Sequence, residues 1–221
     1  MPTLRASNLT LDDVSHLLKF TEQIEDISFS NLLSLESLTE VEKQEIIQIR
    51  TDFRPYLKGK TSEGQVKALT IFPLLRLAGF YRYPIKINVE EGIDNIIIED
   101  EEDENKIIRG RLDILAINSA VPITTNGVFW ILIIEAKESA VEVRQGLPQL
   151  LTYAYKSLEQ QSSVWGLATN GLQYLFVNIQ QGDSPTYQLM PLLDLMSPDS
   201  SIQLLQVLKA ICQLQNVATQ S

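Results

Sequence analysis

The chain has 221 residues, one cysteine and a formal net charge of −10 at pH 7. This length suits one compact domain with a substantial core, and a single cysteine excludes both an intramolecular disulfide and a cysteine-rich zinc site. Residues 1–13 lack a basic stretch followed by a long apolar run, and Pro122 and Gly127 interrupt the uncharged residues 114–134. We therefore expect a cytoplasmic protein that makes no contact with a membrane.

Helical patterns dominate the beginning of the chain. Apolar residues recur at helical spacing in residues 9–20 and 39–53, with Asp, Glu and Lys between them. Thr39 is a candidate N-cap of the second helix, which Pro55 should end. We expect residues 1–60 to form an N-terminal helical extension.

Helix and strand patterns alternate in the rest of the chain. Helices are predicted for residues 62–78, 142–158 and 201–217, and Gly79 should end the first of them. Strands, which are rich in β-branched and aromatic residues, are predicted for residues 84–89, 107–117, 128–136, 164–168, 172–179 and, at an edge, 187–190. Thr169-Asn170-Gly171 is a hairpin signal between two of these strands. The order predicts an α/β sandwich in which helices flank a central mixed β-sheet.

Three charged residues accompany the two most apolar strands: Asp113 lies in the first, and Glu135 and Lys137 lie at the end of the second. Burying an ionised group without a partner costs several kcal/mol, so the sequence must compensate these charges or use them. Glu135 and Lys137 are two residues apart, so both should project from the same face as Ile131 and Ile133. One use for such a cluster is to bind a divalent metal ion.

Five segments of the sequence occur in an order that resembles a known family. They are Thr61-Ser62-Glu63, Gly110-Arg111-Leu112-Asp113, Ile134-Glu135-Ala136-Lys137, Gln149-Leu150-Leu151-Thr152-Tyr153 and Ala168-Thr169-Asn170-Gly171. Over about residues 61–178 the chain is similar to the PD-(D/E)-x-K nuclease superfamily, and within it to the N-terminal nuclease domain of type I restriction enzyme R subunits. One departure is Leu112, where the motif has proline. The resemblance implies that residues 61–221 form a restriction-endonuclease-like nuclease domain, a three-layer sandwich that acts on DNA.

The resemblance also implies a Mg²⁺ ion, with Mn²⁺ as a substitute, held by the carboxylates of Asp113 and Glu135 and the carbonyl oxygen of Ala136. Phosphodiester hydrolysis needs neutralisation of developing negative charge and a deprotonated water, and a hard cation supplies both. Lys137 would orient that water or help to deprotonate it. The alternative is structural: Glu135 and Lys137 form a salt bridge at a strand end, and Asp113 caps a turn.

Further residues would surround this group. Glu63 would approach the metal directly or through water, or it is an ordinary first-turn glutamate favoured by the helix dipole. Gln149 and Tyr153 lie on one helical stripe and would contact DNA or the lysine of the motif, or they form a partly exposed polar stripe. Thr169 and Asn170 either bind phosphate or build the turn, and the turn is the safer interpretation.

The negative net charge opposes nucleic-acid binding, because phosphate contacts need Lys and Arg. Its distribution weakens this objection, since nine of the 28 acidic residues lie in residues 90–104 and eleven of the 18 basic residues lie in residues 50–111. If DNA approaches Asp113, the acidic residues 99–104 must lie away from its path or act as a gate over it.

These observations predict a Mg²⁺-dependent endonuclease of the restriction type, with DNA as its partner. The alternative is a non-catalytic module that keeps the nuclease fold and binds nucleic acid or protein within a defence or repair assembly. Dependence on a protein partner or on a second copy of the chain fits either interpretation. An intact set of Asp113, Glu135 and Lys137 favours catalysis.

Overall fold

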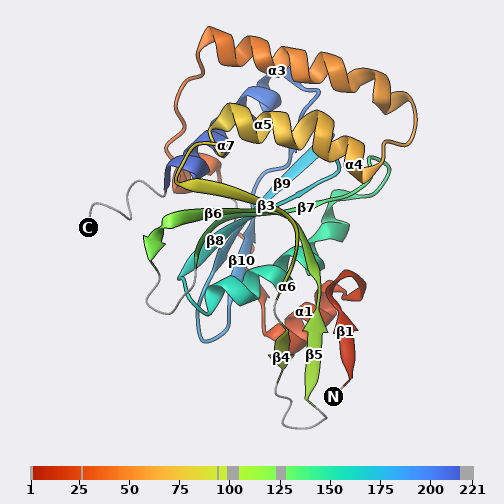
Figure 1. The fold of residues 1–221 in the computed structure, drawn as a ribbon, viewed down its shortest axis with the longest axis vertical. Helices are drawn as coiled ribbons and strands as arrows, with labels where there is room; N and C mark the ends of the chain where they lie inside the picture. The colour runs from red at the N-terminus through yellow and green to blue at the C-terminus, as the bar shows by residue number, and fades with distance from the viewer. Residues whose placement is uncertain (1, 26, 94, 99–104, 123–127, 215–221) are drawn as a thin grey trace.

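The computed structural model describes residues 2–25, 27–93, 95–98, 105–122 and 128–214. These residues form a mixed α/β structure in which helices flank a central sheet of eight strands (Figure 1). The predicted α/β class with a central mixed sheet is confirmed at this level. The acidic residues 99–104, which were expected either to lie away from the DNA path or to act as a gate over it, lie outside the described residues.

The described residues contain seven α-helices, short 3-10 and π segments, and eleven strands. The α-helices are α1 (Leu11–Leu18), α2 (Phe29–Leu32), α3 (Glu40–Phe53), α4 (Glu63–Val66), α5 (Phe72–Ala78), α6 (Leu147–Leu158) and α7 (Pro198–Gln213). The other helical segments are η1 (Ala6–Asn8), η2 (Arg54–Lys58), η3 (Lys67–Ile71) and η4 (Val143–Gly146). The strands are β1 (Thr3–Arg5), β2 (Thr21–Glu22), β3 (Ile85–Gly92), β4 (Ile96–Ile98), β5 (Lys106–Arg109), β6 (Arg111–Pro122), β7 (Val128–Ala136), β8 (Ser163–Thr169), β9 (Gln173–Gln180), β10 (Thr186–Leu189) and β11 (Leu193–Asp194).

The central sheet has the strand order β2-β10-β9-β8-β7-β6-β3, and β11 also pairs with β9. The β7–β8 and β2–β10 pairs are parallel, whereas the other pairs are antiparallel. A parallel pair needs a crossover connection, which α6 supplies between β7 and β8. As a result β7 and β8 finish at the same edge of the sheet, where Ala136 lies beside Thr169. The strand predicted at an edge of the sheet, β10, is instead internal, because β2 pairs with it.

Two apolar cores lie on opposite faces of the central sheet. Helices α3, α5 and α7 cover one face, and α6 with α1 covers the other (Figure 1). Alternate residues of β6 enter opposite cores, so that Ile114 belongs to the first and Leu115 to the second. This alternation places Asp113 on the face that α6 covers.

A one-residue irregularity in the β6–β7 pair corrects one expectation. Ala116 pairs with Leu132 and Ile117 pairs with Trp130, so that Ile131 is an extra residue on β7. Such a bulge shifts the side-chain alternation along a strand. Ile131 consequently joins the core beneath α3 and α5. Both Ile131 and Ile133 were expected on the same face as Glu135, but only Ile133 lies on that face, which α6 covers.

The strand predicted for residues 107–117 is broken at Gly110. Residues before it form β5 in a separate three-stranded sheet, β1-β5-β4, and residues after it form β6 in the central sheet. The physical reason is the Tyr153 ring of α6, which lies so close that a Cβ at position 110 would be 2.6 Å from Cε1 of Tyr153. Glycine therefore allows the backbone to pass the ring and change sheets.

The first sixty residues contribute to both sides of the molecule. Helices α1 and α3 form where helices are predicted, and Thr39 caps α3 with a capping box to Glu42. Two short strands were not predicted: β1 pairs with β5, and β2 pairs with β10. The domain division at residue 60 stays a prediction.

The helix predicted for residues 62–78 forms with a widened turn in its interior. Ser62 caps its first turn, and Gly79 ends it with a φ of +102°. Between α4 and α5 the chain forms the π segment η3, in which the Phe72 amide donates to the carbonyl of Lys67. Pro73 explains the widening, because its ring lacks an N–H and collides with the carbonyl four residues earlier in a regular α-helix.

The later helices follow the prediction with shifted ends. Residues 143–146 form the 3-10 turn η4, and α6 begins at Leu147 with Pro148 in the first turn, where a backbone donor is not required. Helix α7 agrees with the predicted closing helix as far as the structure describes it. None of the helices in the described residues has both the length and the apolar character needed to cross a membrane.

Candidate active site

Asp113 and Glu135 lie side by side at the end of the β6–β7 hairpin. The register pairs Ile114 with Ile134, which places Asp113 opposite Glu135 at the next position. The backbone amide of Ala136 donates to Oδ2 of Asp113 at 2.7 Å and so fixes the orientation of that carboxylate. The structure thus brings together the two carboxylates that the sequence assigned to a metal ion.

Glu135 is a buried carboxylate with one unsatisfied oxygen. The residue is 1% exposed, and Oε1 accepts a hydrogen bond from Nζ of Lys137 at 2.6 Å. Oε2 has no hydrogen-bond partner among the described residues. Burial, with the negative charge of Asp113 in addition, raises the pKa of Glu135 to about 8, although the Lys137 ammonium acts in the opposite direction. An unpaired buried oxygen is costly, so this atom requires a ligand or a proton.

Lys137 is held by a chain of hydrogen bonds that leads back to β6. Its Nζ also donates to Oε1 of Gln149 at 3.3 Å, and Nε2 of Gln149 donates to the hydroxyl of Tyr153 at 2.8 Å. That hydroxyl donates to the carbonyl of Arg111 at 2.8 Å and accepts from the amide of Arg111 at 3.1 Å. Gln149 therefore contacts the lysine of the motif, and Tyr153 contacts the strand that carries Asp113; DNA binding by either residue stays a prediction.

Glu63 reaches this group through a residue that the sequence analysis missed, Lys67. Its Nζ lies 2.7 Å from Oε1 of Glu63 and 2.7 Å from Oδ1 of Asp113, with a side chain that is only 9% exposed. Burial alone would lower the pKa of Lys67, but the bonds to Asp113 and Glu63 outweigh it and the pKa is raised. The spacing of Glu63 and Lys67, four residues apart on a predicted helix, was the signal that could have found this pair.

Thr169 and Asn170 have their side chains engaged with the backbone. The Thr169 hydroxyl donates to the carbonyl of Gln173 and accepts from the amide of Gly171, which has a φ of +84°. The Asn170 amide donates to the carbonyl of Val141, and its oxygen accepts two backbone bonds within the turn. These are the contacts of residues that build a turn, and substrate binding by either residue stays a prediction.

The same turn supports the segment that follows β7. The amide of Lys137 donates to the carbonyl of Thr169 at 2.8 Å, and Asn170 holds Val141 farther along. On the other side, a Cβ at Gly146 would lie 3.2 Å from Cγ of Glu135, so glycine leaves space for the buried carboxylate. Gly146 was not identified from the sequence, because a glycine at a helix start carries no signal of what it contacts.

The donor set available to a hard divalent cation is small, because both oxygens of Asp113 accept hydrogen bonds, from Lys67 and from the Ala136 amide. Oε2 of Glu135 is a free buried oxygen beside Asp113, and Mg²⁺ commonly binds through one or two carboxylates while keeping several waters. Among the described residues, no three His, Cys, Asp or Glu side chains form a group that could hold a metal. Asp113 and Glu135 with a backbone oxygen are therefore the set to consider, and Glu63 contacts Lys67 instead.

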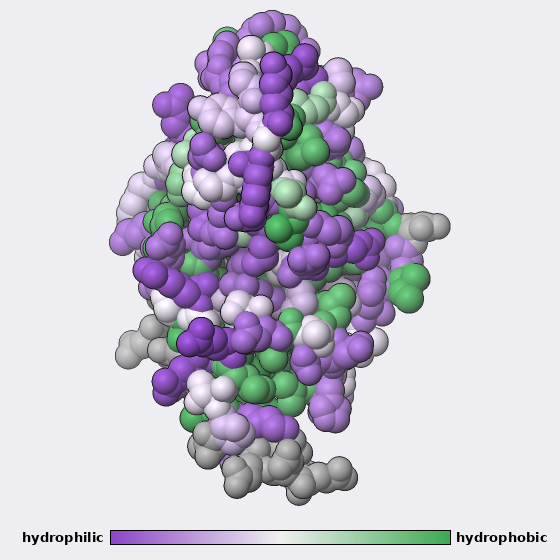
Figure 2. All heavy atoms as spheres, turned by 90° about the vertical axis from the view of Figure 1, so that its right-hand side faces the viewer, coloured by the Kyte–Doolittle hydropathy of each residue, from purple (hydrophilic) through white to green (hydrophobic). Residues whose placement is uncertain are grey.

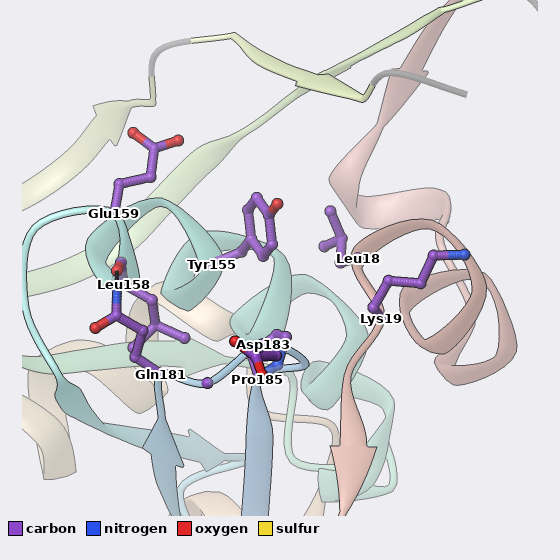
Figure 3. A pocket seen from close by; sticks show the side chains of 9 residues that line it. Leu18, Lys19, Tyr155, Leu158, Glu159, Gln181, Asp183 and Pro185 are labelled. Carbon is purple, nitrogen blue, oxygen red and sulfur yellow. Dashed lines mark hydrogen bonds between the residues drawn. The ribbon is translucent and has the colours of Figure 1, made fainter. Parts of the chain in front are cut away.

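Figure 3 shows a pocket elsewhere, between the end of α1, α6 and the β9–β10 turn. Leu18, Tyr155 and Leu158 form its apolar wall, and Lys19, Glu159 and Asp183 lie at its rim. None of its nine lining residues is among the predicted site residues, so it is separate from the carboxylate cluster.

Comparison with known proteins identifies no family for this chain. No protein-family model matches the chain, and no curated protein matches it. Among solved structures, it is similar to a fragment described as an HsdR subunit of a type I restriction enzyme from Vibrio vulnificus YJ016, with 22% sequence identity and a TM-score of 0.39. The match covers 66% of this chain but only 25% of that chain. A likeness of this degree does not decide activity, which must be argued from the site itself.

Proposed function

We propose that this chain is a metal-dependent nuclease that hydrolyses DNA phosphodiester bonds at a restriction-endonuclease-like site. The observation that carries the proposal is the convergence of Asp113, Glu135 and Lys137, in which Glu135 is buried with one oxygen unpartnered. A sequence that buries this carboxylate without satisfying it sacrifices stability, which is typical of functional sites.

Asp113 and Glu135 would hold Mg²⁺ or Mn²⁺, together with the Ala136 carbonyl. The bound ion supplies charge neutralisation and lowers the pKa of a coordinated water. The chain supplies the rest: the Ala136 amide orients Asp113, and Glu135 and Gln149 hold the Lys137 ammonium in place. Lys137 then orients the attacking water or takes part in its proton transfer.

A plasmid-cleavage assay tests this function. Supercoiled DNA should be nicked or linearised in Mg²⁺ or Mn²⁺ and left intact in EDTA. Asp113→Asn and Lys137→Ala should each lower the rate by about 10²-fold or more, the range expected for loss of a positioned acid–base or ligand group. Asp12→Asn, which changes an exposed carboxylate on α1, is the matched control.

Two outcomes would count against the proposal. Cleavage that persists equally in Asp113→Asn and Asp12→Asn would mean that a contaminant or another site is responsible. Binding of DNA without cleavage in either metal would favour the non-catalytic alternative. One observation supports that alternative: both oxygens of Asp113 already accept hydrogen bonds, from Lys67 and from the Ala136 amide.

A further inference from the structure

A basic segment precedes the first residue of the candidate site. Residues 54–60 include Arg54, Lys58 and Lys60, all exposed, and Tyr56, which is 40% exposed. Among the described residues, no ion pair involves Arg54 or Lys58. In a chain whose net charge is −10, two unpaired cations beside an exposed aromatic ring form a distinct local surface.

This segment is attached directly to the loop that carries Lys137. The amide of Thr61 donates to Oγ of Ser139 at 2.9 Å, and the amide of Ser139 donates back to the carbonyl of Thr61 at 3.1 Å. The ion pair between Lys60 and Glu138, at 2.6 Å, lies beside these bonds. The Thr61 hydroxyl also donates to the carbonyl of Tyr56 at 2.9 Å, which ties the η2 turn to this loop.

The ribbon shows where the segment lies. In Figure 1 the connection from α3 to α4 runs along the same side of the molecule as the end of β7. Figure 2 views that side and shows hydrophilic residues across its middle, above an apolar patch. Lys60 precedes Glu63 by three residues, so their Cα atoms are at most about 10 Å apart. Lys60 therefore lies little more than one Debye length, about 8 Å at physiological salt, from the first residue of the site.

We infer that residues 54–60 bind the DNA phosphate backbone beside the candidate active site. The inference rests on the proposed function, because DNA is the substrate that it assigns. Exposed Arg and Lys can provide phosphate contacts beside the site in a chain that is acidic overall, and Tyr56 offers a face for a sugar or an unpaired base. Because the contacts are to phosphate, they position DNA without reading its sequence.

The test compares two variants of equal charge. Arg54→Gln/Lys58→Gln removes the unpaired cations and keeps the Lys60–Glu138 ion pair. Lys19→Gln/Lys86→Gln removes two exposed cations at the end of α1 and on β3. Binding of a fluorescein-labelled duplex is measured by anisotropy in EDTA over a range of NaCl concentrations, with thermal unfolding as the check that each variant is folded.

The inference predicts that the slope of log K against log [NaCl] falls in magnitude by about 2 in Arg54→Gln/Lys58→Gln, or about 0.9 for each lost phosphate contact. Affinity should fall alike for duplexes of different sequence, and Lys19→Gln/Lys86→Gln should keep the slope of the wild type. Equal losses in both variants would overturn the inference, since only net charge would then matter. If the wild type cleaves DNA but the salt slope of Arg54→Gln/Lys58→Gln is unchanged, the inference is overturned and the proposed nuclease function still stands. No DNA binding or cleavage by the wild type would overturn both proposals.

Discussion

Replacement of Glu135 by glutamine should stabilise the metal-free protein at neutral pH, because the buried carboxyl is then protonated in the folded protein but ionised in the unfolded chain. Burial raises the pKa of Glu135 to about 8 from an ordinary value of 4.5. Below pH 4.5 the carboxyl is protonated in both the folded and the unfolded state, so it imposes no penalty. As the pH rises from 4.5 towards 8, the unfolded chain ionises while the folded chain stays protonated, so the free energy of unfolding falls.

The magnitude follows from the size of the shift. Each pKa unit corresponds to about 1.4 kcal/mol, so wild type should lose about 3 kcal/mol between pH 4.5 and pH 7 because of Glu135. Glutamine has a similar shape, keeps an oxygen that can accept from Lys137, and does not titrate. The stability advantage of Glu135→Gln over wild type should therefore grow by about 2.5 kcal/mol from pH 5 to pH 7.

Urea unfolding followed by circular dichroism, in EDTA at pH 5, 6 and 7, measures this difference. Glu25→Gln, at an exposed position, should run parallel to wild type across the series. Excess Mg²⁺ should restore stability to wild type at pH 7 but not to Glu135→Gln, because the ion favours the charged carboxylate. A constant offset between Glu135→Gln and wild type at all three pH values would refute the argument that this carboxyl is buried and uncompensated.

Two further substitutions test the contacts that support the site. Gly110→Ala would place its Cβ 2.6 Å from the Tyr153 ring, so the ring must move. We expect the free energy of unfolding in urea to fall by about 1–3 kcal/mol. An unchanged midpoint would mean that the ring is not fixed there. Lys67→Met removes the cation between Asp113 and Glu63 and should cost about 3 kcal/mol, with Lys67→Arg as the control that keeps the charge. Addition of Mg²⁺ should then raise the Tm of Lys67→Met by more than that of wild type, and equal thermal shifts would contradict a shared electrostatic site.

Local sequence patterns predict most elements of this fold because each pattern has a local physical cause. Thr39 and Ser62 cap helices through their own hydroxyls, and Gly79 ends a helix because it can adopt a positive φ. The break at Gly110 has no such cause. It depends on the ring of Tyr153, which is 43 positions later in the chain, so the residues near Gly110 in the sequence give no sign that the strand breaks there.

In the candidate site, too, residues with a local signal could be predicted, whereas a residue that depends on the assembled fold could not. Asp113, Glu135 and Lys137 stand out because charges are rare within apolar strands, and their spacing on paired strands predicts that they meet. Lys67 lies in an ordinary amphipathic pattern, where a lysine normally faces solvent. Its burial follows from the π turn η3 and from the packing of that helix beside β6, which are properties of the assembled fold.

The two lysines of the site have different environments, and the roles that we propose for them follow from this difference. Lys67 is nearly buried, and its two carboxylate partners raise its pKa, so it is a fixed positive charge that holds Asp113 in place. Lys137 has a side chain that is 23% exposed and contacts one carboxyl oxygen and one amide oxygen. An ammonium that must meet a water molecule needs access to solvent, which Lys137 has to a greater degree than Lys67. In the proposed nuclease, Lys137 would therefore take part in proton transfer, and Lys67 would position Asp113.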